Sequence, residues 1–256
     1  MTSQSIEELG ARYWAIQDRI AAACAASGRD RSEVNLIVVS KFHPASLVLD
    51  LLSLGQTQFG ENKDQEASAK AAEVAAVLSS TDAGADVNQL EPDWHFVGQL
   101  QSNKVKSVLR YASTIHSLDR PSLLTALAKE HARLADAAQG ETSELPPPTG
   151  VFIELNLTDD DQRGGIQVSQ LEEFAASVLE VPGLNLLGVM GVATLDGQEE
   201  RDFATIQAAS QHLQGLAPKA KYISAGMSND FELAIAYGAT HLRVGTAITG
   251  PRQYLA

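Results

Sequence analysis

A lysine stands just after an apolar run in this sequence. Val34 to Val39 is a near-continuous apolar stretch rich in β-branched residues, which predicts a strand buried on both faces, and Lys41 follows it. Removing a lysine amine from water lowers its pKa and makes it a better nucleophile toward carbonyls. Lys41 is therefore a candidate Schiff-base lysine, although a lysine that extends its amine to solvent from a strand end fits the same position.

Two segments near the C-terminus have the residue types of a phosphate site. Ser228 follows Gly226 after one predicted strand, and Gly245 and Thr246 end the next. Glycine lets a ligand approach the backbone closely, and free N–H groups at a helix start bind anions. In parallel barrels, phosphate often binds in the loops that follow the last two strands.

Simpler roles are open for these positions. Ser228 or Asn229 could instead cap the helix predicted from Phe231 to Tyr237. Arg243 shares a strand face with Gly245 by period-two alternation. A buried guanidinium needs a partner, for which a ring nitrogen, a ligand carboxylate or an ordinary salt bridge would serve.

Two other strand ends carry polar side chains. Asn62 could hydrogen-bond a ring hydroxyl or an oxyanion, and Glu61 could orient a neighbour, although acidic residues also favour a helix start. His95 alternates with apolar neighbours, which fits either the interior of a barrel or an ordinary core histidine. The histidine spacing matches no metal-binding motif.

Alternating strands and helices would hold these residues in place. Strands are predicted to begin near Val34, Gln56, His95, Thr114, Val151, Leu186, Tyr222 and His241. Eight such units predict an α/β fold, a (β/α)8 TIM barrel, as one domain over residues 1–256, with its site at the carboxyl ends of the strands. A doubly wound open sheet is the alternative, but no strand is followed by a G-x-G-x-x-G turn.

Other segments are more ordinary. Apolar periodicity predicts a first helix from Ser5 to Ser27, with Gly28 as its stop. Cys24 lies in this helix and is expected to be buried. Because it is the only cysteine, a disulfide within the chain is excluded. Ser79 to Pro92 and Gln139 to Gly150 are predicted to be exposed loops inserted between helix and strand.

The composition limits the classes of partner. The formal net charge of −13 argues against nucleic-acid binding, which needs a basic face. The sequence does not open with a basic segment followed by an apolar run, and no apolar stretch approaches the ~18 residues of a membrane span. A cytoplasmic protein without nucleic-acid or membrane partners is expected.

Several segments, in order along nearly the whole chain, share one pattern. They are Val38–Lys41, Phe59–Asn62, Trp94–Gly98, Leu100–Lys104, His116–Asp119, Gly188–Met190, Gly226–Phe231 and Arg243–Ile248. Together these segments resemble the pyridoxal phosphate homeostasis protein family, the YggS/PROSC group. One segment would be weak support, but the ordered set is highly specific.

The resemblance implies a barrel like the N-terminal domain of alanine racemase (PLP fold type III), with pyridoxal 5′-phosphate (PLP) bound as an internal aldimine. By this analogy Lys41 forms the Schiff base, and Arg243 faces the pyridine nitrogen. The positions that match phosphate-binding residues are Ser228, Gly245 and Thr246. The positions that match residues lining the ring are Asn62, His95 and Met190.

The chain departs from the family pattern in places. Lys63-Asp64 stands where an aromatic residue is common, and Gln99 stands where histidine is usual. The segment from Asn156 to Gly165 replaces the usual Ser-Lys-Ser-Gly ending. These departures bear on partner surfaces and secondary phosphate contacts, whereas Lys41 is retained.

The residues and the resemblance favour a carrier over an enzyme. A cation such as Arg243 beside the pyridine nitrogen disfavours ring protonation, which makes the ring a weaker electron sink. Racemases of this fold add a second base from another domain, whereas this chain ends at Ala256, shortly after the last predicted strand. The expected function is a monomeric PLP carrier in vitamin B6 homeostasis, with PLP-dependent apoenzymes as candidate recipients.

Three alternatives are open. The first is a PLP-dependent amino-acid racemase or lyase, which would need a base such as His95 or a tyrosine near the barrel mouth. The second is a barrel in which Lys41 acts as an aldolase-type lysine on another phosphorylated metabolite. The third, a structural or partner-binding protein, accords poorly with the polar strand ends.

Overall fold

The N-terminal helix begins and ends where the sequence predicts. The computed structural model describes residues 5–80, 90–141, 147–158, 160, 163–194 and 197–251, and its first helix, α1, spans Ile6–Ala26. Ser5 caps α1 by accepting a hydrogen bond from the Glu8 N–H at 3.2 Å. Gly28 takes a left-handed φ of 66° just beyond the helix end. Cys24 is buried, as expected.

The elements divide between two compact units. Unit 1 comprises Met1–His95 and Gly226–Ala256, and unit 2 comprises Phe96–Ala225. Besides α1, the elements of unit 1 are η1 (Arg31–Glu33), β1 (Asn35–Val39), α2 (Ala45–Ser53), β2 (Gln58–Glu61), α3 (Asp64–Leu78), β3 (Asp93–Phe96, whose last residue belongs to unit 2), α8 (Phe231–Ala236), β9 (His241–Val244) and α9 (Thr246–Thr249). The elements of unit 2 are η2 (Ser102–Lys104), α4 (Val105–Val108), β4 (Ala112–Leu118), α5 (Pro121–Glu141), β5 (Thr149–Asn156), β6 (Ile166–Gln167), η3 (Val168–Gln170), α6 (Leu171–Leu179), β7 (Leu184–Met190), α7 (Glu199–Leu216) and β8 (Tyr222–Ser224).

The chain has the (β/α)8 barrel fold that the sequence predicts. Within the described residues, the strand order is β4-β3-β2-β1-β9-β8-β7-β5-β6, and β4 also pairs with β5. The pairs β1–β2, β1–β9, β4–β5, β5–β7 and β7–β8 are parallel. Each predicted strand is present. The two-residue β6, which pairs with the end of β5, is additional.

In unit 1, strand register sorts the side chains onto two faces. Val39 of β1 lies opposite Gly60 of β2, and Ile37 of β1 lies opposite Arg243 of β9. Paired residues of parallel strands point to the same side, and side chains alternate along each strand. These four residues therefore define one face, which we call the Val39 face. The other face carries the fully buried side chains Val38, Phe59 and Val244.

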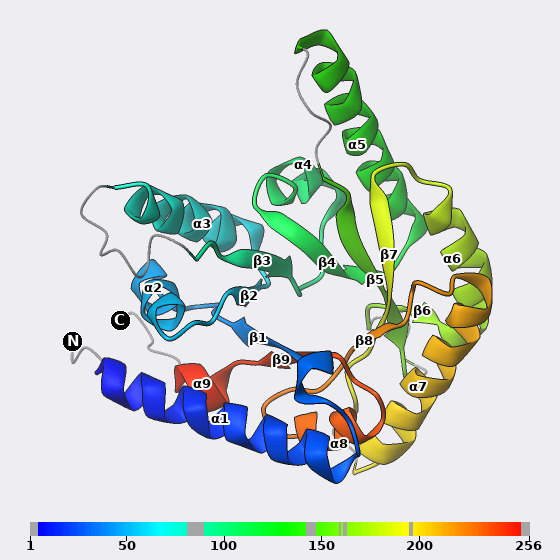
Figure 1. The fold of residues 1–256 in the computed structure, drawn as a ribbon. Helices are drawn as coiled ribbons and strands as arrows, with labels where there is room; N and C mark the ends of the chain where they lie inside the picture. The colour runs from blue at the N-terminus through cyan, green and yellow to red at the C-terminus, as the bar shows by residue number, and fades with distance from the viewer. Residues whose placement is uncertain are drawn as a thin grey trace. The chain divides into compact units, whose positions relative to one another are not determined.

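Helix α1 lies beside α8 and α9 at the end of unit 1 (Figure 1). Arg12 Nε donates to the Ile248 carbonyl at 2.7 Å. Arg29 Nη1 donates to the carbonyls of Ile235 and Ala239 at 2.9 and 2.7 Å. Because these carbonyls belong to α8, α9 and the segment after α8, the guanidinium groups tie α1 and the segment just after it to the elements that flank β9.

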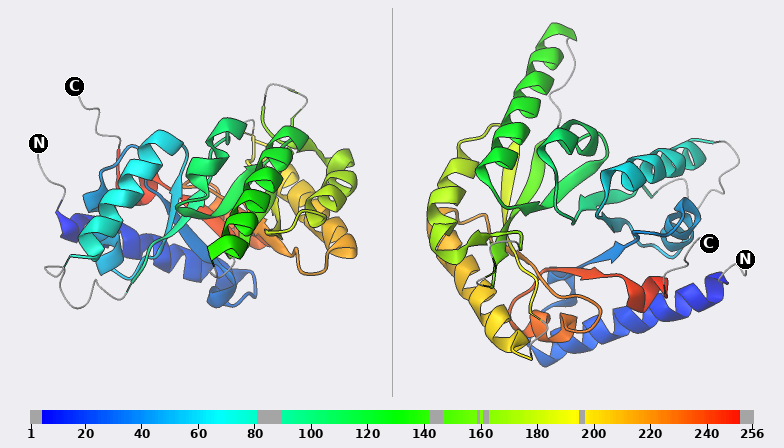
Figure 2. Two further views of the ribbon diagram at one scale, coloured as in Figure 1. Left: turned by 90° about the horizontal axis from the view of Figure 1, so that it is seen from above. Right: turned by 180° about the vertical axis from the view of Figure 1, so that it is seen from behind.

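In unit 2, β5 pairs with β4 on one side and β7 on the other. Helices α6 and α7 lie side by side along β7 (Figure 2). A buried polar pair connects two strands of this unit, because His116 Nδ1 lies 2.8 Å from Ser224 Oγ. The His116 ring also stacks on Phe152, with ring centroids 4.6 Å apart. The apolar strands and this pair form the core of unit 2.

The two predicted inserts lie partly outside the described residues. The insert predicted from Ser79 to Pro92 falls between the end of α3 and the start of β3, but residues 81–89 are not described. The insert predicted from Gln139 to Gly150 is wrong at its edges. Helix α5 continues to Glu141, and β5 begins at Thr149. Residues 142–146 lie outside the described part.

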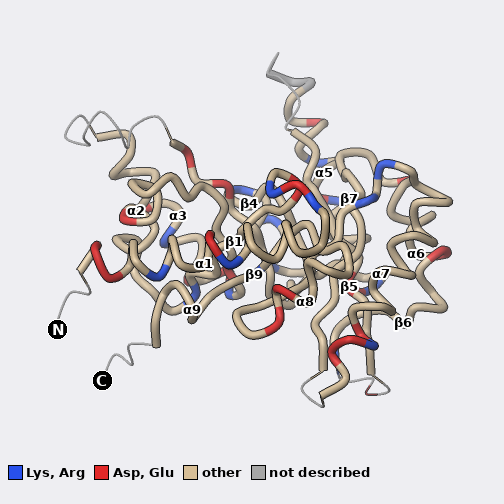
Figure 3. The backbone as a smooth tube through the Cα atoms, turned by 60° about the horizontal axis from the view of Figure 1, so that its bottom comes forward, with Lys and Arg blue, Asp and Glu red and all other residues tan. Residues whose placement is uncertain are grey.

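Charges of both signs are spread over the described chain. Figure 3 shows Lys and Arg positions interspersed with Asp and Glu positions along the backbone. Several form ion pairs on helices, such as Arg133 with Glu130 at 2.6 Å and Arg19 with Glu232 at 2.5 Å. Among the described helices, none combines the length and the apolarity that crossing a membrane requires.

Candidate functional site

Lys41 follows β1 in a tight turn and is half-buried. The Ser40 N–H donates to Gly60 O at 3.0 Å, which continues the pairing of β1, and Ser40 O accepts from the His43 N–H at 3.1 Å. Phe42 has a φ of 67°, the left-handed conformation that a type II turn requires at its third residue. Since a non-glycine residue pays roughly 1–2 kcal/mol for this conformation, the turn beside Lys41 is strained.

Four predicted site residues belong to one face of unit 1. Two-residue alternation, continued just beyond the ends of β1 and β2, assigns Lys41 and Asn62 to the Val39 face. Gly245, two residues after Arg243, is assigned to the same face. A Cβ added at Gly245 would lie 3.5 Å from both the Cβ and the carbonyl oxygen of Val39. The segment after β9 therefore packs against the end of β1, two residues before Lys41.

Asn62 leaves a hydrogen-bond acceptor unused. Its side chain is half-buried, and its Oδ1 atom is fully buried without a hydrogen bond from the described residues. A buried acceptor of this kind is costly unless a donor reaches it. A ligand hydroxyl on the Val39 face would supply that donor.

Arg243 and His95 are both buried, at 6% and 4% exposed. The Asp93 N–H donates to Thr57 O at 2.7 Å, and continuing this parallel register places His95 opposite Gly60, on the Val39 face. His95 Nε2 lies 3.4 Å from Asp93 Oδ2. His95 is therefore a buried residue on this face with Asp93 beside it, and its role toward a ligand stays a prediction.

His241 extends this buried polar layer. Its Nε2 lies 3.5 Å from Asn35 Nδ2. Burial, as the largest cause, and the nearby His95 and Arg243 together lower the pKa of His241 to about 3, against the opposing effect of Asp93. His241 is therefore neutral in the folded protein at ordinary pH.

This neutral His241 predicts that stability falls on acidification. Between its ordinary pKa of 6.5 and its folded value of about 3, the unfolded chain binds a proton that the folded chain does not. Stability contributed by His241 is therefore complete above 6.5 and is lost as pH falls toward 3. Between about pH 7 and pH 5, the wild type should lose about 2 kcal/mol more than His241→Gln in urea unfolding. Equal losses in the two proteins would contradict this assignment.

The residues predicted to bind phosphate come together at the end of β9. The Ala247 N–H donates to Ser228 Oγ at 3.4 Å, which joins the loop after β8 to the start of α9. Gly245 is the N-cap of α9 and makes no side-chain cap. Ser228 and Gly245 are half-buried, and Thr246 is exposed. This arrangement places the Ser228 hydroxyl beside the backbone N–H groups at the start of α9.

The alternative that Ser228 or Asn229 caps α8 is wrong. The N-cap is Asp230, and its Oδ1 accepts a hydrogen bond from the Met227 N–H within its own turn. Because Asp230 closes this turn, Ser228 Oγ bonds to Ala247 instead.

Gly226 is required where β8 leads into this loop. Its φ is 91°, and an added Cβ would lie 2.8 Å from Ala234 Cβ and 2.9 Å from Phe231 Cα. Gly226→Ala should therefore destabilise the protein by about 2 kcal/mol or more in urea unfolding, from strain and overpacking together. Gly215→Ala is the control, because a Cβ at Gly215 in α7 meets nothing within 4 Å. The explanation fails if the two variants are equally stable.

Met190, predicted to line the ring, ends β7 in unit 2. It is 3% exposed and lies opposite Ser224 of β8 and Glu154 of β5. Its role toward a cofactor stays a prediction.

Two departures from the family pattern meet in unit 2. The first is Gln99, which stands where the family usually has histidine, and the second is the 156–165 segment, which replaces the usual Ser-Lys-Ser-Gly ending. A Cβ added at Gly164 would lie 1.7 Å from Gln99 Nε2, so Gln99 packs directly on this segment. A cavity of about 330 Å³ lies beside this contact, lined by Gln99, Leu100, Gln101, Asp119, Arg120, Arg163, Gly164 and Gly165. Asp119 forms an ion pair with Arg120 at 2.5 Å. Residues 159, 161 and 162 of the segment lie outside the described part.

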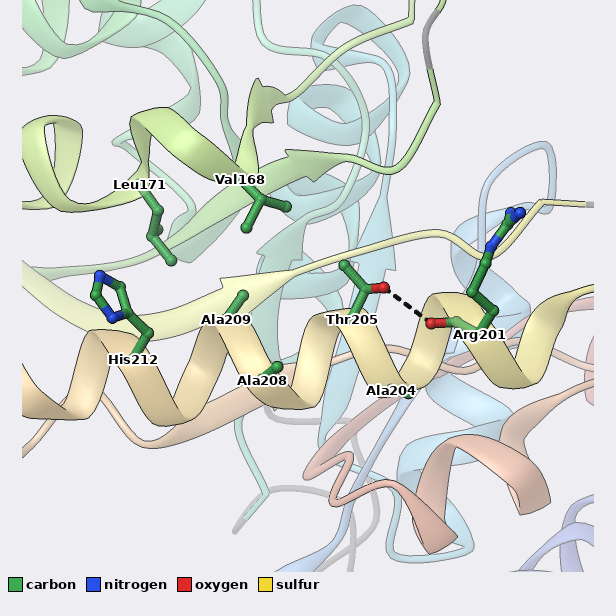
Figure 4. Close-up of a pocket in the computed structure, with 8 residues that line it drawn as sticks. All are labelled: Val168, Leu171, Arg201, Ala204, Thr205, Ala208, Ala209 and His212. Carbon is green, nitrogen blue, oxygen red and sulfur yellow. Dashed lines mark hydrogen bonds between the residues drawn. The ribbon is translucent and has the colours of Figure 1, made fainter.

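An apolar groove lies between α7 and the segment from η3 to α6. Figure 4 shows its lining residues, mostly small or apolar, with the Thr205 hydroxyl bonded to the Arg201 carbonyl at 2.9 Å. His212 closes one end and lies 3.4 Å from Glu172. The groove contains none of the predicted site residues.

Two charged residues contact the Lys41 turn, of which sequence reasoning passed over Lys70 and took Glu66 only as weak evidence for acid–base chemistry. Lys70 Nζ donates to Ser40 O at 2.8 Å, and Glu66 accepts from the Phe42 N–H. Glu66 and Lys70 are spaced i,i+4 on α3, a pattern typical of a surface helix pair. That spacing carried no signal of a functional position.

Comparison with known proteins defines the class. The family model for the N-terminal domain of alanine racemase matches residues 14–253. Alanine racemase from Corynebacterium glutamicum is 12% identical, with a TM-score of 0.63 over 94% of this chain and 62% of that one, a likeness of fold alone. This protein is therefore a (β/α)8 barrel of the alanine racemase N-terminal-domain class.

Curated relatives narrow the class to one family. Pyridoxal phosphate homeostasis proteins of Mycobacterium tuberculosis and Escherichia coli are 38% and 37% identical, covering 93% of this chain and 91% and 94% of theirs. PipY of Synechococcus elongatus, solved with PLP bound, is 30% identical, with a TM-score of 0.72 over 90% of this chain and 100% of PipY. The chain belongs to the pyridoxal phosphate homeostasis protein family.

Proposed function

We propose that this chain binds PLP covalently through Lys41 and acts in vitamin B6 homeostasis as a carrier without substrate turnover. The observation that carries the proposal is the shared position of Lys41, Asn62 and Arg243 along the Val39 face, next to the linked segments of Ser228 and Gly245. The names of the curated relatives and the PLP-bound PipY support it.

The residues present fit PLP. The unused acceptor of Asn62 suits a ring hydroxyl, and the buried cation of Arg243 suits an unprotonated ring nitrogen. Ser228, Gly245 and Thr246 would hold the phosphate through a hydroxyl and backbone N–H groups. Bound there, PLP supplies an aldehyde, with which a primary amine condenses with loss of one water. In unit 1, the residue that would line the ring is His95.

The buried charge of Arg243 supports a carrier role. A guanidinium facing the ring nitrogen opposes its protonation, and an unprotonated ring withdraws electrons weakly from a bound amino acid. Reversible exchange of one amine for another needs little electron withdrawal, whereas racemisation needs much. Lys41 would then release the cofactor by exchange with another amine or with water.

A spectrum of the purified protein tests the proposal. Added PLP should turn the protein yellow, and borohydride should make the link permanent. Peptide mapping should then place the modification on Lys41. Incubation with alanine or serine, followed by chiral chromatography, should return the starting enantiomer. Formation of the opposite enantiomer would favour the racemase alternative, and a protein that stays colourless in excess PLP would refute PLP binding.

The proposal extends to the state of the protein. We infer one domain, a monomer and a cytoplasmic location, with PLP-dependent apoenzymes as recipients. Light scattering of the PLP-loaded protein tests the monomer. Reactivation of a PLP-dependent apoenzyme by the loaded protein, compared with the same amount of free PLP, tests directed transfer.

A further inference from the structure

Three charged side chains converge behind the turn that carries Lys41. Glu61, at the end of β2, is fully buried, and Lys70, on α3, is 5% exposed. Lys70 Nζ donates to Glu61 Oε1 at 2.6 Å and to Glu66 Oε1 at 3.2 Å. Glu66 lies in the first turn of α3, with 29% of its side chain exposed. We call Glu61, Glu66 and Lys70 the α3 ion triad.

The triad bonds to the chain on both sides of Lys41. Ser40 Oγ donates to Glu61 Oε1 at 2.7 Å, and Ser40 O accepts from Lys70 Nζ at 2.8 Å. The Phe42 N–H donates to Glu66 Oε1. The residues immediately before and after Lys41 are therefore both tied to α3 by charged groups, which make the stronger kind of hydrogen bond.

The bond to Phe42 acts at a strained position. Phe42 has the left-handed φ of 67°, and such a conformation persists only where its surroundings hold it. The Glu66 carboxylate fixes the N–H of this residue, and the turn bond from His43 N to Ser40 O fixes the other end. Release of the Phe42 N–H would allow the turn to relax, which would redirect the residue before it.

We propose that the α3 ion triad positions Lys41, holding residues 40–42 in the strained turn that presents the Lys41 amine to an aldehyde on the Val39 face. This inference rests on the proposed function, because it concerns how Lys41 reaches its PLP-bound form. Glu61, Glu66 and Lys70 are positioning residues that act through the backbone of Ser40 and Phe42. The inference assigns a role to residues on the opposite side of β1 and β2 from the predicted ligand.

Glu66 is the member to test, because it is partly exposed and its loss does not leave a bare charge in the core. Glu66→Ala should slow the appearance of the yellow form after PLP is added by about tenfold, as the loss of one hydrogen bond to a charged group would. Glu66→Gln keeps an acceptor oxygen and should retain most of the rate. Glu73→Ala, an exposed glutamate further along α3, is the matched control and should behave as the wild type.

Two further measurements separate positioning from general damage. Affinity for 4′-deoxypyridoxine 5′-phosphate, which has a methyl group in place of the aldehyde, should be unchanged in Glu66→Ala, since that ligand does not need the Lys41 amine. Adding Phe42→Gly to Glu66→Ala should restore the rate, because glycine adopts a positive φ without strain.

The outcomes distinguish this inference from the proposed function. A colourless wild type would refute PLP attachment itself. A yellow wild type with an equally fast Glu66→Ala would refute only the positioning role. A Glu66→Ala protein that loses affinity for the deoxy analogue as much as it loses rate, or that Phe42→Gly fails to rescue, would also overturn it.

Discussion

Lys41→Ala protein, mixed with excess PLP and then freed of unbound cofactor, is expected to lack the yellow band of the covalent form and to gain no borohydride-stable label at this turn. An alanine has no amine, so condensation with the aldehyde cannot occur at this position. The loss should be complete for the covalent form, while the phosphate contacts at Ser228 and Gly245 are left in place. Absorbance measures the colour of the covalent form, and mass analysis after reduction measures the label. The deoxy analogue should still bind to the variant, which separates loss of attachment from loss of the site.

Two lysine variants control this experiment. Lys63 is a neighbouring, exposed lysine whose Nζ lies 5.4 Å from the centre of the Phe42 ring. Lys63→Ala should become yellow like the wild type, since its amine is not the one that follows β1. Lys41→Arg keeps the charge but supplies no nucleophilic amine, and should also stay colourless. A borohydride-stable label on Lys41→Ala as strong as that on the wild type would disprove the assignment.

Lys70→Met is expected to lower the free energy of unfolding by about 3–5 kcal/mol at neutral pH. The substitution removes the cation from a pair in which the Glu61 carboxylate is fully buried. Burial already raises the pKa of Glu61, and Lys70 is the main group that opposes this rise. Without Lys70, a buried carboxylate must either remain unpaired or bind a proton, and both cost stability. Urea unfolding measures the loss.

The pH dependence of this loss follows from the raised pKa of Glu61. A raised folded-state pKa means that stability is fully present below the ordinary value of 4.5 and is lost as pH rises through the folded value. The deficit of Lys70→Met should therefore shrink as pH is lowered toward 4.5.

Adding Glu61→Gln to Lys70→Met should recover most of the loss at neutral pH, because no charge then remains buried. Glu172→Gln, from the exposed pair with His212, should leave stability unchanged. If the double variant is as unstable as Lys70→Met alone, the loss of stability does not come from an unpaired, buried Glu61 carboxylate.

Much of the fold was predictable because its signals are local. The apolar run before Lys41 and the repeated alternation of strand and helix are readable residue by residue, since buried strands and amphipathic helices have characteristic periods. The rule that barrel sites lie at carboxyl strand ends then pointed to Asn62, Ser228 and Gly245. The additional β6 and the continuation of α5 were missed because a two-residue strand and the last three residues of a helix carry almost no periodic signal.

The sequence by itself determined the barrel class, the order of its strands along the chain and the family, because these depend on local apolar patterns and on motifs in fixed order. Only the tertiary structure decided which side chains meet. Strand register puts Arg243 on the face of Val39 and Gly60, to which Lys41 and Asn62 are assigned by alternation, and Ser40 bonds to Glu61 and Lys70, which are 21 and 30 residues away. Such contacts depend on how strands align and where a helix packs, and no spacing within one segment encodes them.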